Sequence, residues 1–248
     1  MSQSATTTSP GYVVAAMTVL GAVALLVGIL FGTITYALVG APLSLSPTGA
    51  AGQLLTNIGT YAALAAAGGV YLLRYDLPLS YVRYRRPGIR DLATAGATII
   101  GLFALAVAIP PIVTRLGLPL AEHSIAETIQ ADPAIALVFL PVSVLVVGPA
   151  EEFIYRGIIQ TRLREVFDTG SAVAIAAVIF ASVHFLAYFD PGNVSGTIVT
   201  ITFLLLPLGA ILGSVYEHTG NVVVPMLAHG LYNAITFALT YAEAVGLF

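Results

Sequence analysis

Two adjacent glutamates and an arginine stand inside a long apolar stretch of this sequence. Glu151 and Glu152 follow a run of mostly apolar residues, and Arg156 comes four positions after Glu152. Charged groups inside a membrane helix are costly, so they are rare and usually functional. In a helix, Glu152 and Arg156 share one face in the orientation that favours an ion pair. Glu151 has no such partner, so it is the carboxylate left free to act as a base.

Polar side chains also interrupt two later apolar stretches. His184 comes four residues after Phe180, and His229 comes four residues before Asn233. A single buried histidine is more often structural than catalytic. A carboxylate with two imidazoles, however, can activate water, either directly or on a metal ion. An amide such as Asn233 can donate a hydrogen bond to a developing oxyanion.

These residues predict a hydrolytic site for a carbonyl compound, with a peptide bond as the natural substrate. The candidate catalytic residues are Glu151, Glu152, Arg156, His184, His229 and Asn233. A zinc ion is a candidate cofactor, with Glu151, His184 and His229 as its ligands, because imidazole and carboxylate are good zinc ligands. The chain has no cysteine, which excludes disulfides and thiolate metal sites.

The elements that must position these residues are membrane helices. Hydrophobic residues make up 58% of the 248-residue chain and charged residues only 8%, too few to cover a surface facing water. We therefore expect an all-α, polytopic membrane protein with about seven transmembrane helices. The expected helices are 11–38, 53–73, 92–113, 133–167, 171–189, 196–216 and 221–241. The expected regions are a polar tail (1–10), N-terminal helices and loops (11–133) and a catalytic core (134–241).

Arginine placement predicts the orientation in the membrane. Five of the nine basic residues lie between residues 74 and 90, so this loop should face the cytoplasm. Helix counting then puts the N-terminus in the cytoplasm and the C-terminus outside. The first apolar run is expected to be a retained helix rather than a cleaved signal peptide. The net charge of −3 gives no reason to expect nucleic acid. We also predict a water-accessible cavity that opens toward the cytoplasm.

Depth along each helix tests whether the polar groups can meet. Glu151 lies about 24 Å above residue 167, and His184 lies about 20 Å above residue 171, at the helical rise per residue. His229 lies only about 12 Å from residue 221, which is shallow unless the preceding turn dips into the membrane. His123 and His218 fall in predicted loops or helix ends and are expected to be solvated.

The three motifs together resemble a known family. Glu-Glu-x-x-x-Arg at 151–156, Phe-x-x-x-His at 180–184 and His-x-x-x-Asn at 229–233 are similar, in order and on separate helices, to motifs of the CPBP family. That family includes CAAX prenyl proteases of the Rce1 type and bacteriocin-processing enzymes. The resemblance implies an intramembrane endopeptidase in which Glu151 activates water and Glu152 with Arg156 supports the site. It further implies that His184 and His229 orient the water or bind a metal, and that Asn233 stabilises the oxyanion.

Three alternatives remain open at this point. Helix 133–167 could end near residue 150, which would leave the Glu-Glu-Arg group at an ordinary solvated helix end. The chain could be a non-proteolytic membrane scaffold of the same fold. It could also be a proton-coupled transporter, since acidic residues and histidines build proton relays. A protease would act on a membrane-associated protein or peptide, possible substrates including prenylated CAAX tails.

Overall fold

The computed structural model describes residues 9–247, which fold into helices joined by short loops, with no strand in that part of the chain. Residues 1–8 of the predicted polar tail lie outside the described residues. The α-helices are α1 (Pro10–Thr35), α2 (Ala50–Arg74), α3 (Ile89–Arg115), α4 (Ile125–Ala131), α5 (Ala134–Val142), α6 (Gly148–Glu152), α7 (Thr161–Arg164), α8 (Thr169–Val183), α9 (Val194–Thr200), α10 (Leu206–Thr219) and α11 (Val223–Ala244).

Several of these helices join through wider or tighter helical turns into longer rods. Turns of π-helix are η1 (Tyr36–Gly40), η3 (Ser143–Val147), η4 (Phe153–Gln160) and η6 (Ile201–Leu205), and turns of 3-10 helix are η2 (Leu79–Val82) and η5 (His184–Tyr188). As a result, residues 134–164 form one continuous helical rod, as do residues 194–219. The predicted helices 133–167 and 196–216 correspond to these two rods.

Six helical rods in the described residues are long and apolar enough to cross a membrane. The predicted count of seven is not confirmed, because α2 is not among these six. This helix has 25 residues but carries Gln53, Thr56, Asn57 and Thr60 along its first half. These polar side chains lower its mean hydropathy, and three of them line the central cavity described below.

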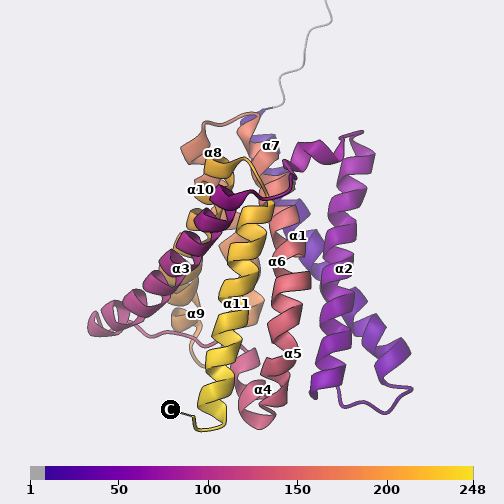
Figure 1. The fold of residues 1–248 in the computed structure, drawn as a ribbon, viewed down its shortest axis with the longest axis vertical. Helices are drawn as coiled ribbons and strands as arrows, with labels where there is room; N and C mark the ends of the chain where they lie inside the picture. Colours follow the sequence, from indigo (N-terminus) through magenta and orange to yellow (C-terminus); the bar gives the residue numbers. More distant parts are fainter. Residues whose placement is uncertain (1–8, 248) are drawn as a thin grey trace, which may run out of the picture.

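The rod α5–α7 packs against α11 at the centre of the bundle (Figure 1). Two glycines set their spacing. A Cβ added at Gly148 would lie 2.8 Å from the carbonyl oxygen of Met226 and 2.9 Å from the backbone of Gly230. A Cβ added at Gly230 would lie 2.8 Å from the carbonyl oxygen of Ser143. Glycine at both positions therefore brings the two backbones into direct contact, as small residues do between membrane helices.

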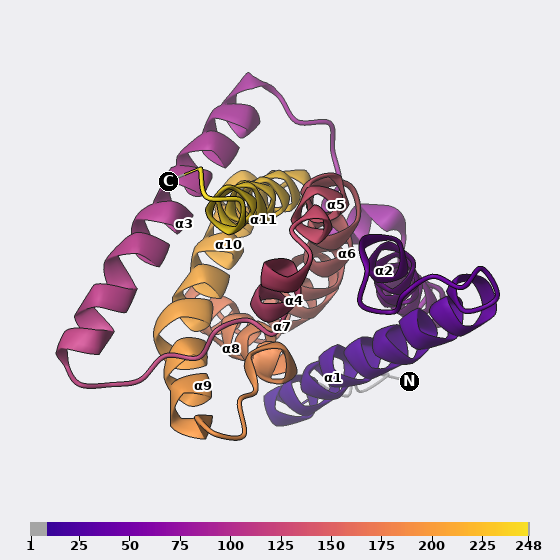
Figure 2. The same cartoon turned by 90° about the horizontal axis from the view of Figure 1, so that it is seen from below.

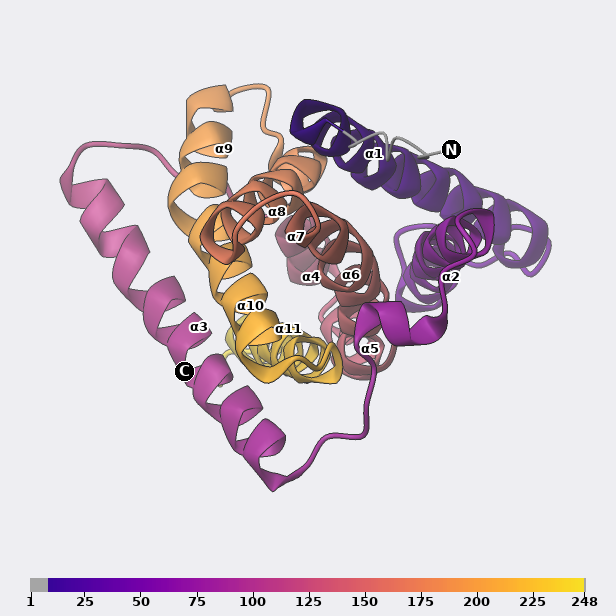
Figure 3. The same cartoon turned by 90° about the horizontal axis from the view of Figure 1, so that it is seen from above.

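One end of the bundle carries the arginine-rich connection between α2 and α3 (Figure 3). Arg85 makes two hydrogen bonds to the Asp91 carboxylate, at 2.6 and 2.8 Å, and a third to the carbonyl of Thr219 at 3.0 Å. Arg83 pairs with Glu217 at 3.1 Å. These contacts attach the connection to the turn between α10 and α11.

The opposite end of the bundle is crossed by the chain between α3 and α5, which includes α4 (Figure 2). The amide of Ala121 donates to the Thr200 hydroxyl at 2.9 Å, and the amide of Ser124 donates to the carbonyl of Ala187 at 2.9 Å. Ile129 of α4 is buried in an apolar cluster with Phe139. These contacts hold α4 and the segment before it beneath the bundle.

Candidate active site

The acidic pair lies inside the rod α5–α7, well away from either end. The rod continues twelve residues beyond Glu152, to Arg164. Glu151 is 7% exposed, Glu152 is 0% exposed and Arg156 is 1% exposed. The alternative of a solvated helix end at residue 150 is therefore wrong.

A buried ion pair compensates the charge of Glu152. Its Oε1 accepts a hydrogen bond from Arg156 Nη1 at 2.8 Å, which confirms the pair predicted from the four-residue spacing. The other terminal nitrogen of Arg156 donates to the carbonyl of Gly209 on α10 at 3.0 Å. The guanidinium also lies 4.3 Å from the ring centroid of Phe180 on α8. Arg156 thus joins three helices around the acidic pair.

Each predicted histidine is oriented by a hydrogen bond at Nδ1. His229 Nδ1 lies 2.8 Å from Glu152 Oε1, and His184 Nδ1 lies 2.7 Å from the carbonyl oxygen of Phe180. Carbonyl and carboxylate oxygens only accept, so we assign the proton to Nδ1 in both rings. In the neutral imidazoles, Nε2 is then the atom with the free lone pair.

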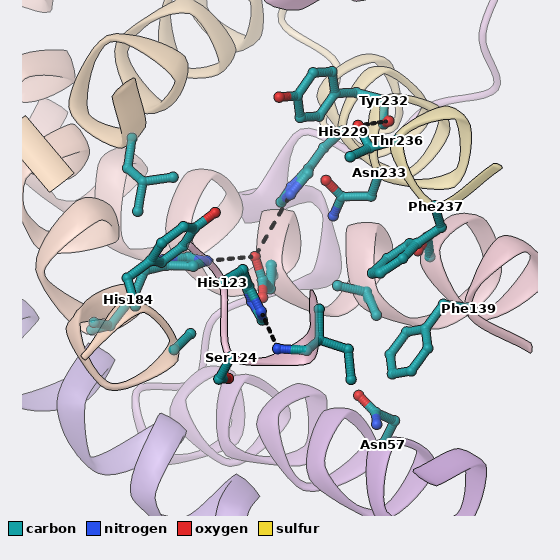
Figure 4. A pocket seen from close by; sticks show the side chains of 18 of the residues that line it. Asn57, His123, Ser124, Phe139, His184, His229, Tyr232, Asn233, Thr236 and Phe237 are labelled. Carbon is teal, nitrogen blue, oxygen red and sulfur yellow. Dashed lines mark hydrogen bonds and ion pairs between the residues drawn. The ribbon is translucent and has the colours of Figure 1, made fainter. Parts of the chain in front are cut away.

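Both Nε2 atoms face the same oxygen of Glu151. His184 Nε2 lies 3.8 Å from Glu151 Oε2, and His229 Nε2 lies 3.9 Å from it. These distances are too long for direct hydrogen bonds, and Oε2 is buried without any hydrogen-bond partner in the described residues. Figure 4 shows the rings of His184 and His229 converging on one carboxylate from two different directions. Three acceptors therefore surround a space that a hydrogen donor such as water would satisfy.

The meeting of these three side chains can be compared with the depths estimated along each helix from the sequence. Glu151 and His184 were expected at similar depths, and they meet. His229 was expected to be shallow, yet it reaches the same point because the turn before α11 is folded into the bundle. Its first residue, Asn221, is 0% exposed, and Val222 and Val224 are also 0% exposed.

The predicted zinc ligands have suitable chemistry but a wide spacing. Zinc holds these donors at about 2.0–2.2 Å in a tetrahedron, which places neighbouring donor atoms roughly 3.3 Å apart. The two Nε2–Oε2 distances of 3.8 and 3.9 Å are longer than this. In the part of the chain that the structure describes, no three His, Asp or Glu side chains are placed to hold a metal ion. A zinc requirement therefore stays a prediction, and no step below depends on it.

A cavity of about 550 Å³ adjoins Glu151 and is lined by residues of both the predicted core and the N-terminal helices. Asn233 is one turn beyond His229 on α11 and faces the same space (Figure 4). All six predicted site residues thus gather around one point, with Glu152 and Arg156 behind Glu151 and Asn233 at the cavity wall.

The sequence analysis missed the polar wall that α2 adds to this cavity. Gln53, Asn57, Thr60 and Tyr61 all line it, at the spacing of one helical face. The spacing of these residues in the sequence predicts a polar helical face, but it does not predict which neighbouring element that face contacts.

The prediction that His123 is solvated is wrong. His123 lines the cavity, and its ring packs edge-on against Tyr188 with 4.9 Å between centroids. Its Nδ1 accepts from the amide of Ile125 at 3.1 Å. Burial lowers the pKa of His123 to about 4, and the neighbouring His184 contributes in the same direction. His218 lies exposed at the end of α10, as expected.

The cavity lies in the half of the bundle away from the arginine-rich loop. Its lining on α11 continues from His229 to Thr240, and on α2 from Leu64 back to Gln53. The cavity lining therefore extends away from the loop that is predicted to face the cytoplasm, whereas the sequence analysis expected the cavity to open toward that side.

Comparison with known proteins agrees with the motifs. Residues 133–235 match the family model described as type II CAAX prenyl endopeptidase Rce1-like. This segment is Rce1-like. The Rce1-like segment begins at the start of α5 and ends within α11, so it contains all six predicted site residues. The family resemblance read from the three motifs is thereby confirmed.

Two further comparisons bear on the chain. The uncharacterized protein YpbD of Bacillus subtilis (strain 168) is 34% identical over 91 residues, which are 37% of this chain and 40% of that protein. The match thus spans less than half of that relative's length. No solved structure matches the chain.

Proposed function

We propose that this protein is an intramembrane endopeptidase that hydrolyses peptide bonds of membrane-associated substrates with a water activated by Glu151. The observation that carries the proposal is the meeting of Glu151 Oε2 with two imidazole Nε2 atoms at 3.8 and 3.9 Å beside a cavity. The Rce1-like match supports the reaction class.

The geometry suggests how one water could be held and activated. A water in this space donates one hydrogen to Glu151 Oε2 and the other to an imidazole Nε2, which leaves an oxygen lone pair directed at the cavity. As that oxygen bonds to the scissile carbonyl carbon, Glu151 takes the proton. The C–N bond then breaks, and Glu151 passes the proton to the leaving amine. The products are a carboxylic acid and an amine.

The surrounding groups have supporting roles in this proposal. Glu152 fixes the ring of His229, as a carboxylate commonly does for a working histidine. Arg156 pairs with Glu152 and holds that carboxylate in place. Asn233 offers amide hydrogens to the oxyanion that forms on the carbonyl oxygen.

The test is cleavage of internally quenched peptides by the purified protein. We expect Glu151→Gln, which keeps the shape of the side chain, to lower kcat by about 10²–10⁴-fold, the range for loss of a general base. Glu243→Gln, an exposed acid near the end of α11, is the matched control and should keep full activity. Full cleavage by folded Glu151→Gln would refute the proposed role. If neither the unmodified protein nor the Glu151→Gln variant cleaves any peptide, the result would point to the scaffold alternative.

A further inference from the structure

Seven of the nine arginines gather at one end of the bundle. Arg115 lies at the other end, and Arg156 is buried in the site. The seven are Arg74, Arg83, Arg85, Arg86, Arg90, Arg162 and Arg164. They lie at the C-terminal end of α2, along the connection from α2 into the first turn of α3, and on α7; these parts of the chain share the upper end of the bundle in Figure 1. Short loops rich in arginine stay in the cytoplasm, so this end is assigned to the cytoplasmic side.

The cavity extends from the acidic pair in the opposite direction. From His229 to Thr240, its lining covers about 16 Å along α11, at the helical rise per residue. On the side away from the arginine-rich end, it is also lined by His123 and Ser124 of the segment that crosses beneath the bundle, and the amide of Ser124 donates to the carbonyl of Ala187, three residues beyond His184, at 2.9 Å (Figure 4). No residue from the arginine-rich connections is part of its lining among the described residues.

The half of the bundle between the acidic pair and the arginine-rich end is packed. Ile158, Gln160 and Tyr216 are each 0% exposed in this region. Gln160 donates to the carbonyl of Gly213 at 2.9 Å, and the hydroxyls of Thr161 and Tyr216 lie 2.8 Å apart. This layer separates Glu151 from the arginine-rich face.

We infer that the site is reached from the extracytoplasmic side, so that the substrates are peptide segments exposed on that side by membrane-anchored or exported proteins. The inference rests on the proposed endopeptidase function for its substrate class. Cytoplasmic prenylated tails are not substrates under this inference. The direction of access itself rests only on the arginines, the cavity and the packed layer.

Absence of native cysteine makes the direction of access directly measurable. Ser124→Cys places a thiol on the cavity side, and Ser80→Cys places a matched thiol on the arginine-rich side; both serines are exposed. In intact cells, a membrane-impermeant maleimide should label Ser124→Cys, and it should label Ser80→Cys only after permeabilisation. The reverse pattern would overturn the inference.

A second arm tests the substrate class. The quenched-peptide sequence that the purified protein cleaves fastest is placed next to a membrane anchor, on the outer side in one reporter and on the cytoplasmic side in another. We expect only the outer reporter to be cut in cells. Cleavage of only the cytoplasmic reporter would overturn the inference and leave the proteolytic function intact. If the purified protein cleaves no peptide, the proposed function fails, and the labelling pattern alone decides the direction of access.

Discussion

The buried pair of Glu152 and Arg156 gives a prediction with a magnitude. The two side chains are 0% and 1% exposed, and their charged atoms lie 2.8 Å apart. Glu152→Gln leaves the Arg156 charge uncompensated, and Arg156→Met does the same to Glu152. Removing one partner of a buried pair costs about 3–5 kcal/mol. For a chain of this size, that free energy corresponds to a loss of roughly 6–20 °C in Tm.

The double variant separates charge compensation from simple packing. With Glu152→Gln and Arg156→Met together, no charge is left unpaired, and the glutamine oxygen can still accept from His229 Nδ1. The remaining cost is the unmade hydrogen bond to the Gly209 carbonyl, about 1–3 kcal/mol. The double variant should therefore be more stable than either single variant, whereas independent effects would add to roughly 6–10 kcal/mol.

The assay is thermal unfolding in detergent micelles, followed by the helical circular dichroism signal. The chain has no tryptophan, so fluorescence would be a weak reporter. A double variant that melts below both single variants would refute the argument that unpaired charge is the main cost. A loss below about 1 kcal/mol in each single variant would show that water reaches the pair, because exposed pairs have small values.

Four further predictions concern the site and the cavity. If the Asn233 amide stabilises the oxyanion, Asn233→Ala should lower kcat by about 10²–10³-fold with little change in KM. A rise in KM as large as the fall in kcat would contradict this role. A chelator should abolish cleavage if zinc is required, whereas full activity after exhaustive chelation would remove zinc from the mechanism. The pKa of His123 is about 4 in the folded protein and near 6.5 in the unfolded chain. Between these two values the unfolded chain binds the proton more readily, so the stability that neutral His123 contributes is complete above pH 6.5 and is lost as the pH falls toward 4. Hydrogen exchange of residues 118–126 should therefore accelerate over that interval relative to His123→Gln measured at the same pH, and identical profiles would count against it. Glu122 and Glu127 are exposed acids on the segment beside the cavity. At low salt, peptides with lysine near the cut should therefore have a higher kcat/KM than matched peptides with glutamate, and the two values should converge above roughly 0.5 M salt. A preference that does not change with salt would speak against a surface charge effect.

The sequence predicted the inner site better than its surroundings. The pairing of Glu152 with Arg156 follows from helical geometry alone, because both residues lie on one helix. The meeting of Glu151 with His184 follows from equal depth on adjacent membrane helices. The depth of His229 could not be predicted, since it depends on a buried turn before α11 rather than on the helix itself.

The cavity lining and its direction required the packed structure. The polar face of α2 is visible in the spacing of Gln53, Asn57 and Thr60, but its rotation toward the cavity is set by packing against α1 and α5. His123 looked solvated because it belongs to a loop, and the path of a loop beneath a bundle is not encoded in periodicity. The separation between the arginine-rich loop and the cavity lining depends on how the helices pack, so the sequence alone could not show it.

The direct backbone contact of Gly148 with Gly230 has a consequence for how this molecule can change. It fixes the separation between the helix that carries Glu151 and Glu152 and the helix that carries His229, independently of the first three helices. The side chains of α2 line the cavity but take no part in that contact. If the protein cleaves peptides as proposed, replacing the cavity-facing side chains of α2 should change which peptides it accepts while leaving the contact between the two site helices undisturbed, so α2 is the place to begin a redesign of its selectivity.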